Sequence, residues 1–376
     1  MAVVRKVLII GGGFSGMAAA IQMRKAGIDV DLIEIDPNWR PEGAGITVSG
    51  PTMRALETIG VFDEFARRGF TSSGVDLLTP NGQKIGEIPT PKVAGSDVPG
   101  GGGIMRPELA RILADATHTS GVAVRVGCTY TAIEQTGEQV TVAFTDGTTD
   151  TYDLVVAADG VLSKTRERFF AEVKPPHYIG QGVWRAVLPR PLDIVRPRMW
   201  LGGAVKVSVN PVSLTHLYMF ITEARPEKLR IDAKTWPQLV DGMIEPFSDP
   251  VLAALRPHLF AAEAAIDYRP LSNLLVPAPW NRGRVILIGD TVAATTPHLA
   301  SGAGIGIESG IVLAEELAKA ATLQDAFDGF HARRWERCRM VIENSERLCR
   351  IEMENGDKAE HARIMRESVM ALTQPI

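Results

Sequence analysis

The sequence predicts an α/β protein in which distant parts of the chain join in one parallel sheet. Val7–Ile10 is a four-residue apolar run that stops at Gly11, which is typical of a buried parallel strand. Phe14–Ala26 has apolar residues at helical spacing and Asp29–Ile35 is a second strand, so the chain opens with a strand–helix–strand unit of about thirty residues. Val285–Ile288 repeats the buried strand type much later, so the predicted sheet is discontinuous in sequence.

Between these ends the chain contains further strand signals. Val122–Val126 reads as a strand, and Val140–Thr145 and Thr149–Ala157 read as two more. The dipeptide Asp146-Gly147 predicts a hairpin between the last two. The four glycines of Gly100–Gly103 predict a flexible spot.

Residues 176–270 differ in character from the flanking chain. Prolines are frequent there, and segments such as Lys206–Asn210 and Leu217–Thr222 alternate in polarity, which predicts an antiparallel sheet with one packed face. Gly302–Lys319 and Ala326–Arg350 then read as helices. The predicted order is therefore a first α/β layer, a β-rich insert, a return to the first layer, and C-terminal helices.

Composition and charge exclude several classes of protein. The chain has 376 residues, 45% hydrophobic and 22% charged, which is ordinary for globular proteins and enough for two or three domains. A net charge of −4 gives no basic field, so nucleic acid is not an expected partner.

The cysteines and apolar runs predict a cytoplasmic protein. Cys128, Cys338 and Cys349 are odd in number and show no CxxC spacing, so neither a disulfide framework nor a zinc site is expected. The histidines form no metal-ligand pattern, and no metal is predicted. No apolar run approaches about 18 residues, and glycines interrupt the N-terminal run, so neither a membrane helix nor a signal peptide is expected.

The first strand is followed by a dinucleotide fingerprint. Gly11-Gly12-Gly13-Phe14-Ser15-Gly16 fits G-x-G-x-x-G, and an acid, Glu34, follows in the next strand 23 positions after Gly11. Gly11 permits the tight turn, Gly13 lets the backbone approach a pyrophosphate, and Gly16 lets the helix pack on the strand. The helix N-terminus favours the phosphates, and the carboxylate of Glu34 favours a ribose hydroxyl over a 2′-phosphate. The bound adenosine is therefore expected to belong to FAD or NAD.

Two later strands end in aspartate. Asp159-Gly160 follows the apolar run Leu154–Ala158, which places the pair at the carboxyl edge of the sheet. Asp290 closes the strand that follows Gly283, and small residues at 302–304 open the next helix. Such a helix start lets backbone N–H groups and the helix dipole stabilise a planar ring that becomes anionic on reduction.

Together the three motifs resemble the FAD-dependent aromatic hydroxylases of the para-hydroxybenzoate hydroxylase type, the class A flavoprotein monooxygenases. The motifs follow one another in that family's order and span most of the chain. Within the family, the sequence most resembles the urate hydroxylase-like members. The resemblance implies a discontinuous Rossmann-like FAD-binding domain, an inserted antiparallel β-sheet substrate domain and a C-terminal helical segment. Their predicted residues are 1–75, 100–175 and 271–322 for the first, 76–99 and 176–270 for the second, and 323–376 for the third.

The resemblance also implies which residues contact FAD. The segment after the acidic strand looks like the family's backbone near the flavin, Arg106 is similar to an arginine on the ribose and phosphates, and Tyr130 falls where a strand passes the adenine. The predicted cofactor-binding residues are Gly11, Gly13, Phe14, Ser15, Gly16, Glu34, Ile35, Gly45, Ile46, Thr47, Arg106, Tyr130, Asp159, Gly160, Asp290, Pro297, Gly302, Ala303 and Gly304.

The chain departs from the family pattern in two places. The family's usual G-D-A-A-H reads here as residues 289–293 with Ala293 in the histidine position, although the aspartate is kept. The usual G-Q-G reads Ala300-Ser301-Gly302. Roles that depend on the histidine side chain do not transfer, and the flavin edge is expected to be lined differently.

The implied chemistry is aromatic hydroxylation. By resemblance, NADH or NADPH reduces FAD transiently, O₂ adds to form a flavin C4a-hydroperoxide, and its distal oxygen attacks an electron-rich carbon of an aromatic or N-heteroaromatic substrate. No second G-x-G-x-x-G is present for the nicotinamide, which suits this class and weakens a disulfide-reductase interpretation. The protein must orient the substrate, help to ionise it and exclude water.

Three residues are candidates for the catalytic work. Tyr218 and Lys206 stand on predicted strands of the insert, and either could polarise or deprotonate a phenol or ring N–H. Lys206 occupies the position of a substrate-facing arginine in urate hydroxylase-like members, but lysine is not an equivalent fork, so urate is a doubtful substrate. His298 follows Pro297 beside the expected flavin and could act as a base. The alternative to these catalytic roles is that Tyr218 is only a packed side chain and Lys206 only a solvated one.

Two other functions remain open from the sequence. One is a flavin dehydrogenase or reductase of the same fold that does not use oxygen, and the other is a non-enzymatic flavin-binding protein. The expected partners are a small aromatic substrate and O₂, with no membrane, and the protein is expected to be a monomer or homodimer.

Overall fold

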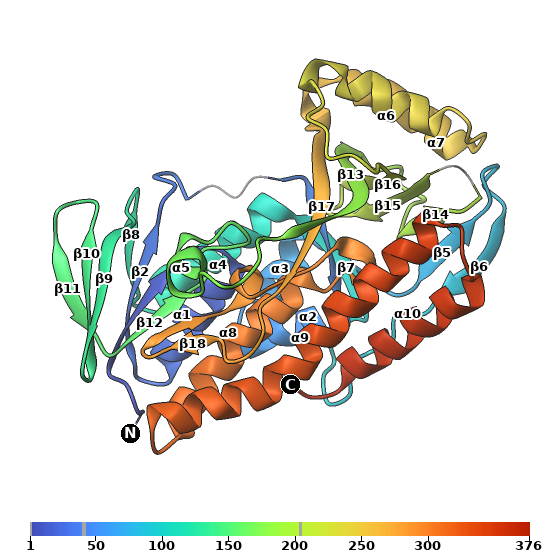
Figure 1. The fold of residues 1–376 in the computed structure, drawn as a ribbon. Coiled ribbons are helices and arrows are strands. Elements are labelled where there is room, and N and C mark those ends of the chain that lie inside the picture. Colours follow the sequence, from blue (N-terminus) through green and yellow to red (C-terminus); the bar gives the residue numbers. More distant parts are fainter. Residues whose placement is uncertain (1, 40–42, 203–204) are drawn as a thin grey trace.

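The computed structural model describes residues 2–39, 43–202 and 205–376. Its first unit is built on a six-stranded sheet, several strands of which are labelled in Figure 1. Five strands are parallel and the edge strand β18 is antiparallel to its neighbour. The order is β18 (Asn281–Arg282), β19 (Val285–Leu287), β12 (Leu154–Ala157), β1 (Lys6–Ile10), β2 (Asp29–Glu34) and β8 (Ala123–Val126). The predicted α/β class and the return of the late strand to the first sheet are confirmed.

Alternation along these short strands divides the core into two layers. Val7 and Ile9 pack with the helices α1 (Phe14–Lys25), α8 (Gly302–Lys319) and α9 (Leu323–Met353). Leu8 and Ile10 point the other way, against a three-stranded antiparallel sheet. Because β1, β2, β12 and β19 are parallel, the turns that follow them all meet at one edge of the sheet.

The three-stranded sheet shows that one predicted strand was wrong. Its order is β11 (Thr149–Tyr152), β10 (Gln139–Phe144) and β9 (Tyr130–Thr136). The chain from Thr149 to Ala157 is two strands in two sheets, β11 and β12, rather than one. Asp153 stands at the break, where its carboxylate accepts from the backbone N–H groups of Arg5 and Lys6 at 2.6 and 3.0 Å. This tie turns the chain from one layer into the next.

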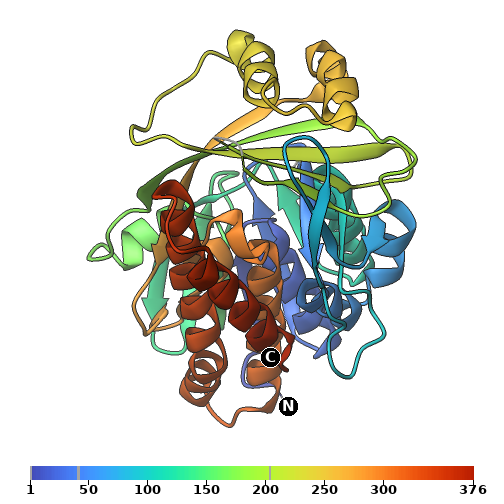
Figure 2. The same cartoon turned by 90° about the vertical axis from the view of Figure 1, so that its right-hand side faces the viewer.

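The predicted antiparallel insert forms a large second sheet, which covers the first unit from above in Figure 2. On one face Trp184, Leu217 and Met219 pack with α6 (Trp236–Ile244) and α7 (Pro250–Leu255), two helices that the sequence analysis did not assign. The other face looks toward the first sheet's edge. The order is β20 (Ala293–Ala294), β17 (Asp267–Leu275), β13 (His177–Pro189), β16 (His216–Ala224), β15 (Lys206–Pro211), β14 (Arg198–Trp200), β5 (Val75–Leu78) and β6 (Lys84–Ile88).

The glycine-rich stretch predicted to be flexible is instead the middle of a small sheet. Strand β7 (Gly101–Met105) lies between β3 (Gly45–Ser49) and β4 (Phe70–Ser72). A Cβ on Gly102 would lie 2.4 Å from the Phe70 carbonyl oxygen, and one on Gly103 would lie 2.5 Å from that of Pro211. The glycines are therefore needed for close packing of backbones rather than for mobility.

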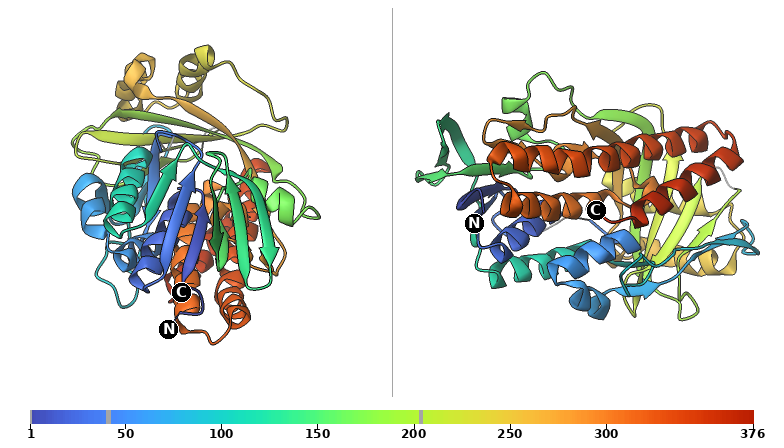
Figure 3. Two further views of the ribbon diagram at one scale, coloured as in Figure 1. Left: turned by 90° about the vertical axis from the view of Figure 1, so that its left-hand side faces the viewer. Right: turned by 90° about the horizontal axis from the view of Figure 1, so that it is seen from below.

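The remaining helices surround these sheets. Helices α2 (Gly50–Ile59), α3 (Phe62–Arg68), α4 (Arg106–Thr119) and α5 (Lys164–Phe169) flank the first unit, and α10 (Lys358–Thr373) lies beside α9. The right-hand view of Figure 3 shows α9 running from the first unit to the large sheet. Among the described residues, no helix has the length and apolar character needed to cross a membrane. We keep the three-part domain division as a proposal, which is supported by β5 and β6 lying in the sheet of the insert.

Candidate functional site

The glycine turn after β1 has the geometry that its motif predicts. Gly11 has φ +106°, and a Cβ there would lie 2.4 Å from the Ala158 carbonyl oxygen. Gly16 packs equally tightly, since its Cβ would lie 2.1 Å from the Gly11 carbonyl oxygen. Around Gly13, in contrast, a Cβ would meet nothing within 4 Å. The turn is tight at two glycines and open at the third, where a diphosphate is expected.

The N-terminus of α1 is free to receive an anion. Its N-cap is Gly13, no side chain accepts from the first turn, and that turn contains no acidic residue. The Arg106 guanidinium lies 5.1 Å from the centre of the Phe14 ring, so positive charge stands beside the helix start. The Ser15 side chain faces Gly289 and Gly306, where a Cβ would approach its Oγ to 2.1 and 2.4 Å.

The acidic residue at the end of β2 touches the same turn. Glu34 accepts from the backbone N–H groups of Gly12 at 2.8 Å and Asp36 at 2.9 Å. A carboxylate has about four lone-pair sites, so acceptor capacity remains for a ribose hydroxyl. The neighbouring Ile35 is 71% exposed, which leaves an apolar surface at the sheet edge suited to an adenine ring.

The two aspartate motifs are bonded to each other. Asp159 lies at the N-terminus of α5, where its carboxylate accepts from Ser163 Oγ at 2.6 Å and from the Thr165 N–H at 3.1 Å. Thr291, next to Asp290, accepts the Gly160 N–H at 3.0 Å through Oγ1. The Tyr130 hydroxyl lies 3.4 Å from Thr165 Oγ1, which brings Tyr130 to the Asp159 motif.

Asp290 and Arg106 border one solvent-accessible region at the sheet edge, which we call the hollow. The Asp290 side chain is accessible to water, yet the surrounding protein raises the pKa of its carboxyl, and Arg106 opposes that rise. Burial likewise lowers the pKa of Arg106, which Asp290 opposes while Arg185 and Arg269 add to it. Asp290 and Arg106 are therefore oppositely charged groups that are open to water and that the surrounding protein partly encloses.

The other predicted flavin contacts lie on β3 and in the turn and helix start of α8. A Cβ on Gly45 would lie 2.4 Å from Tyr218 Cβ, and Thr47 Oγ1 accepts from Asn210 at 3.0 Å, so β3 is pressed against the large sheet. Ile46 lies between them on β3. Helix α8 begins at Gly302 without a side-chain cap and without an acid in its first turn. Pro297, Ala303 and Gly304 belong to this turn and helix start.

Tyr218 has a partner that the sequence analysis missed. Its ring is buried and stacks on Phe220 at 5.7 Å between centres. The Arg185 Nε–H donates to the Tyr218 hydroxyl at 3.2 Å, and Arg185 Nη1 lies 3.3 Å from Asp267 Oδ2. Register pairs Arg185 with Phe220 across β13 and β16, so Arg185 and Tyr218 share the sheet face that looks at the hollow.

Lys206 and His298 are brought together at a different carboxylate. Lys206 Nζ lies 2.6 Å from Glu352 Oε1, and His298 Nε2 lies 3.5 Å from Glu352 Oε2. Lys206 is therefore an ion-paired side chain rather than a solvated one. Burial alone would raise the pKa of Glu352, but Lys206 and the nearby histidines hold that pKa far below its usual range.

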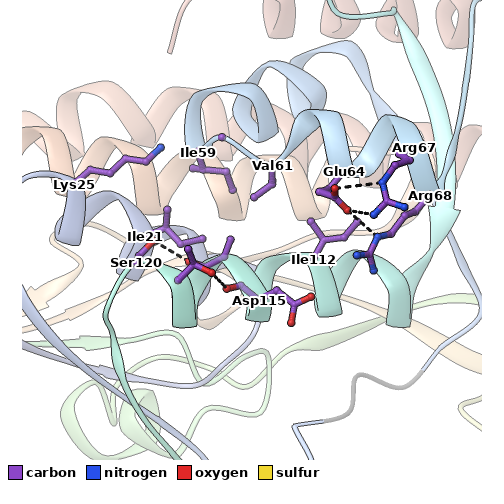
Figure 4. Close-up of a pocket in the computed structure, with 13 residues that line it drawn as sticks. Ile21, Lys25, Ile59, Val61, Glu64, Arg67, Arg68, Ile112, Asp115 and Ser120 are labelled. Carbon is purple, nitrogen blue, oxygen red and sulfur yellow. Dashed lines mark hydrogen bonds and ion pairs between the residues drawn. The ribbon is translucent and has the colours of Figure 1, made fainter.

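The hollow fits FAD on the observations above. Open space at Gly13, two uncapped helix N-termini and Arg106 suit the diphosphate and the reduced ring, while Glu34 and Ile35 suit ribose and adenine. A second surface groove lies elsewhere, between α1, α3 and α4 (Figure 4). None of the predicted site residues lines it, and its apolar floor of Ile21, Ile59 and Ile112 is edged by ion-paired arginines.

Three site residues were missed because their partners are remote in sequence. Arg185 bonds to Tyr218 on β16, and Thr291 bonds to the loop after β12. Glu352 contacts side chains from three separate elements. For Arg185 a signal existed, since a charged residue interrupts an otherwise apolar strand next to Trp184. For Glu352, near the end of a charged helix, no local pattern distinguishes it from its exposed neighbours.

Comparison with known proteins adds four findings. The model of the FAD binding domain family matches residues 5–345. The 2-heptyl-3-hydroxy-4(1H)-quinolone synthase of Pseudomonas aeruginosa is 30% identical, over 82% of this chain and 79% of its own. The FAD-dependent urate hydroxylase of Klebsiella pneumoniae is 27% identical, over 92% and 90% respectively. The crystal structure of Klebsiella pneumoniae HpxO with FAD and uric acid has the same fold, with a TM-score of 0.80, 23% identity and coverage of 99% and 93%.

Proposed function

This chain belongs to the FAD binding domain family, and on that premise we propose that it hydroxylates an N-heteroaromatic small molecule that presents an acceptor oxygen. The protein is a FAD-dependent monooxygenase, an oxidoreductase, and not one of the two alternatives that the sequence left open. The substrate class is the proposed part. It draws on relatives whose names specify a quinolone and urate.

FAD would be held by residues of the first unit. The α1 N-terminus and Arg106 would hold the diphosphate, Glu34 the ribose, and the α8 N-terminus the flavin end. Bound FAD, reduced by NADH or NADPH, supplies the activation of O₂ from which one oxygen atom enters the substrate. The chain's own residues enclose the reaction, orient the substrate and hold its proton.

The observation that carries the substrate proposal is the Arg185–Tyr218 hydrogen bond. Arg185 can only donate, so the Tyr218 hydroxyl accepts from it and its own proton must point elsewhere. The face that both residues share looks at the hollow, which gives Tyr218 a donor role there. A substrate with a carbonyl or phenolate oxygen satisfies this donor, and the Tyr218–Phe220 stack offers a flat apolar wall.

The test uses the FAD-loaded enzyme with 4(1H)-quinolone and 3-hydroxypyridine as probes. We expect oxidation of NADH or NADPH under air that is accelerated by the accepted probe, and a product heavier by one oxygen atom. Tyr218→Phe is expected to raise KM for that probe at least tenfold, since a lost hydrogen bond to an ionised or strongly polar oxygen is worth about 1.5–3 kcal/mol. Turnover under argon with an organic acceptor, or a Tyr218→Phe variant that matches wild type, would contradict the proposal.

Tyr178→Phe is the matched control. Tyr178 lies on the same sheet in β13, and its hydroxyl donates to the Arg225 carbonyl oxygen away from the hollow. This variant is expected to keep the wild-type KM, which separates a loss at the site from a general disturbance of the sheet.

We also propose that the protein is cytoplasmic and acts as a monomer or homodimer. The free, buried state of Cys128, Cys338 and Cys349 supports a reducing compartment. Gel filtration of the FAD-loaded protein tests the oligomeric state, and a larger assembly would contradict it.

A further inference from the structure

The middle glycine of the first turn has both of its peptide groups bonded to side chains. Gly12 donates its N–H to Glu34 Oε2 at 2.8 Å, and its carbonyl oxygen accepts from the indole Nε1–H of Trp39, also at 2.8 Å. Glu34 ends β2 and Trp39 follows in the next loop. Two side chains from one short stretch of chain therefore set the orientation of the peptide units on either side of Gly12.

The loop after β2 holds Trp39 against the glycine turn. The Asp36 carboxylate accepts the Asn38 N–H at 3.0 Å, and the Asp36 carbonyl oxygen accepts the Trp39 N–H at 3.1 Å. The indole is half-buried and meets the His118 ring edge-on, with 5.5 Å between the ring centres. Trp39 has φ +46°, which is uncommon for a bulky residue, so the contacts of its side chain must offset that strain.

The indole also accounts for the glycine at position 12, which the fingerprint leaves open. Gly12 does not have the positive φ of Gly11, so its backbone conformation alone does not require glycine. A Cβ on Gly12 would lie 2.3 Å from Trp39 Nε1 and 3.1 Å from Glu34 Oε2. The close approach of Trp39 is therefore what excludes a side chain at this position.

The bond from Trp39 fixes a second donor, the Gly13 N–H. The Gly12 carbonyl and the Gly13 N–H belong to one planar trans peptide unit, in which the two groups point in opposite directions. Because the carbonyl is directed at Trp39, the Gly13 N–H points away from the indole. Gly13 is exposed at the N-cap of α1, and none of the residues that the structure describes accepts its N–H.

We propose that Trp39 is a positioning residue for FAD, whose indole N–H holds the Gly12–Gly13 peptide unit so that the Gly13 N–H is presented to the diphosphate. The inference deepens the cofactor part of the proposed function and rests on it. Glycines stand on both sides of this unit, so side-chain contacts restrict its rotation very little. Rotation would turn the partial negative charge of the Gly12 carbonyl oxygen toward the anion, and the bond from Trp39 opposes it.

The test removes the indole N–H and keeps the shape of the ring. Trp39 is replaced by β-(3-benzothienyl)alanine, which has sulfur in place of the N–H, and Trp39→Phe is made beside it. We expect the Kd for FAD, measured by flavin fluorescence, to rise about fivefold to tenfold in both, the size expected when one ordinary hydrogen bond is lost. A benzothienyl protein that binds FAD as tightly as wild type overturns the proposal, because the ring alone would then suffice.

Two fragments of the cofactor locate the effect. ADP carries the diphosphate and adenosine does not, and each is measured by its competition with FAD. We expect the Kd for ADP to rise by the same factor as that for FAD, while the Kd for adenosine stays at its wild-type value. A general loss of structure, or a direct contact of Trp39 with the adenine ring, would weaken adenosine as well, so equal losses for ADP and adenosine overturn the proposal.

Trp236→Phe is the matched control. Trp236 is also half-buried, and its indole N–H also donates to a backbone carbonyl, that of Ile231 at 3.3 Å, at the start of α6. This variant is expected to keep the wild-type Kd for FAD and ADP. An equal rise in Trp236→Phe would make the effect a general result of losing a tryptophan and would overturn the role of Trp39.

A second measurement does not depend on a change at Trp39. In wild-type apoprotein labelled with 15N-glycine, the amide signal of Gly13, identified by its loss in Gly13→Ala, is followed during titration with ADP and with adenosine. We expect ADP to move this signal and adenosine to leave it in place. A Gly13 amide that ADP does not move contradicts the proposal even where the Trp39 variants fail to fold.

Failure of the proposed function has a separate signature. Wild-type protein that binds FAD and ADP but oxidises neither NADH nor NADPH with any probe contradicts the hydroxylation, whatever the Trp39 variants show. An active enzyme whose benzothienyl form keeps the wild-type affinity for FAD contradicts only the role of Trp39.

Discussion

Two glycines of the same turn have opposite tasks. Gly11 has a positive φ and no room for a side chain, so any substitution there strains the fold. Gly13 has φ −74°, which any residue can adopt, and open space beside it. Gly13 is therefore expected to be dispensable for folding and required for the cofactor.

Gly13→Leu tests this separation. We expect the apoprotein to unfold at the same temperature as wild type, while the Kd for FAD, measured by flavin fluorescence, rises at least tenfold as the side chain takes the place of the diphosphate. Gly242→Leu is the control, because Gly242 is exposed in α6 and a Cβ there also meets nothing within 4 Å. Unchanged FAD affinity in Gly13→Leu would contradict the placement of the diphosphate.

At the scale of elements, one threonine joins the turns after β12 and β19. Thr291 Oγ1 accepts the Gly160 N–H, and the Thr291 carbonyl accepts from Arg166 at 2.9 Å. These bonds hold the Asp159 and Asp290 turns against each other at the sheet edge.

Thr291→Val keeps the shape of the side chain and removes the tie. We expect a loss of about 1–2 kcal/mol in the free energy of unfolding, since the Gly160 N–H loses its acceptor. Urea unfolding of the apoprotein measures it, and Thr119→Val, an exposed threonine at the end of α4, should change stability by less. Equal effects in the two variants would show that the inter-turn bond contributes nothing.

A histidine joins α9 to the chain before β18, and it predicts a pH dependence. Burial lowers the pKa of His331, whose Nε2 accepts from the Trp280 N–H. The neutral ring is favoured in the folded state, so the unfolded chain binds more protons as pH falls below about 6.5. We expect stability to decline from pH 7.5 to 5.5 and to decline less steeply in His331→Gln, as urea unfolding at both values would show. His298 has the same sign, so part of the slope should remain.

At the scale of the whole molecule, Glu308 of α8 is the anchor between the first unit and the chain's end. It is 2% exposed and lies 2.9 Å from Arg334 and 2.7 Å from Arg337 of α9. Arg337 also donates to the Leu372 carbonyl oxygen at 2.7 Å, and Arg54 donates to that of Thr373 at 3.0 Å. The carboxylate and the last carbonyls of α10 thus share one set of arginines.

Glu308→Gln leaves these buried arginines without their counter-ion. We expect a loss of about 3–5 kcal/mol in the free energy of unfolding, the cost typical of a buried charge without its partner. Glu336→Gln breaks the pair with Arg339 on the exposed side of α9 and should cost about 1 kcal/mol or less. Urea unfolding measures both losses. If Glu308→Gln loses no more free energy of unfolding than Glu336→Gln, Glu308 does not anchor α9 and the end of α10.

Local patterns in the sequence were sufficient to predict the turns at which we expect the cofactor to bind. The turn at Gly11 follows β1, Glu34 is the last residue of β2, and Asp159 and Asp290 follow β12 and β19. These strands are parallel, so they must end at one edge of the sheet. The periodicity that identifies those strands is a property of neighbouring residues, so the α/β class and the discontinuous sheet could be predicted. The helices α6 and α7 were missed because their short, proline-flanked patterns lie inside a β-rich stretch.

Contacts between remote segments were decided by tertiary structure alone. The sequence predicted a flexible spot at Gly102 and Gly103. In the structure the backbones of Phe70 and Pro211 lie so close that only glycine fits, and no local sequence pattern indicates these contacts. Lys206 and His298 were predicted as catalytic candidates, and that role stays a prediction. The carboxylate that both side chains face belongs to Glu352, which lies 146 positions after Lys206. Charge pairing depends on distance in space, so the sequence determined where the cofactor turns lie and only the fold decided which groups face one another across them.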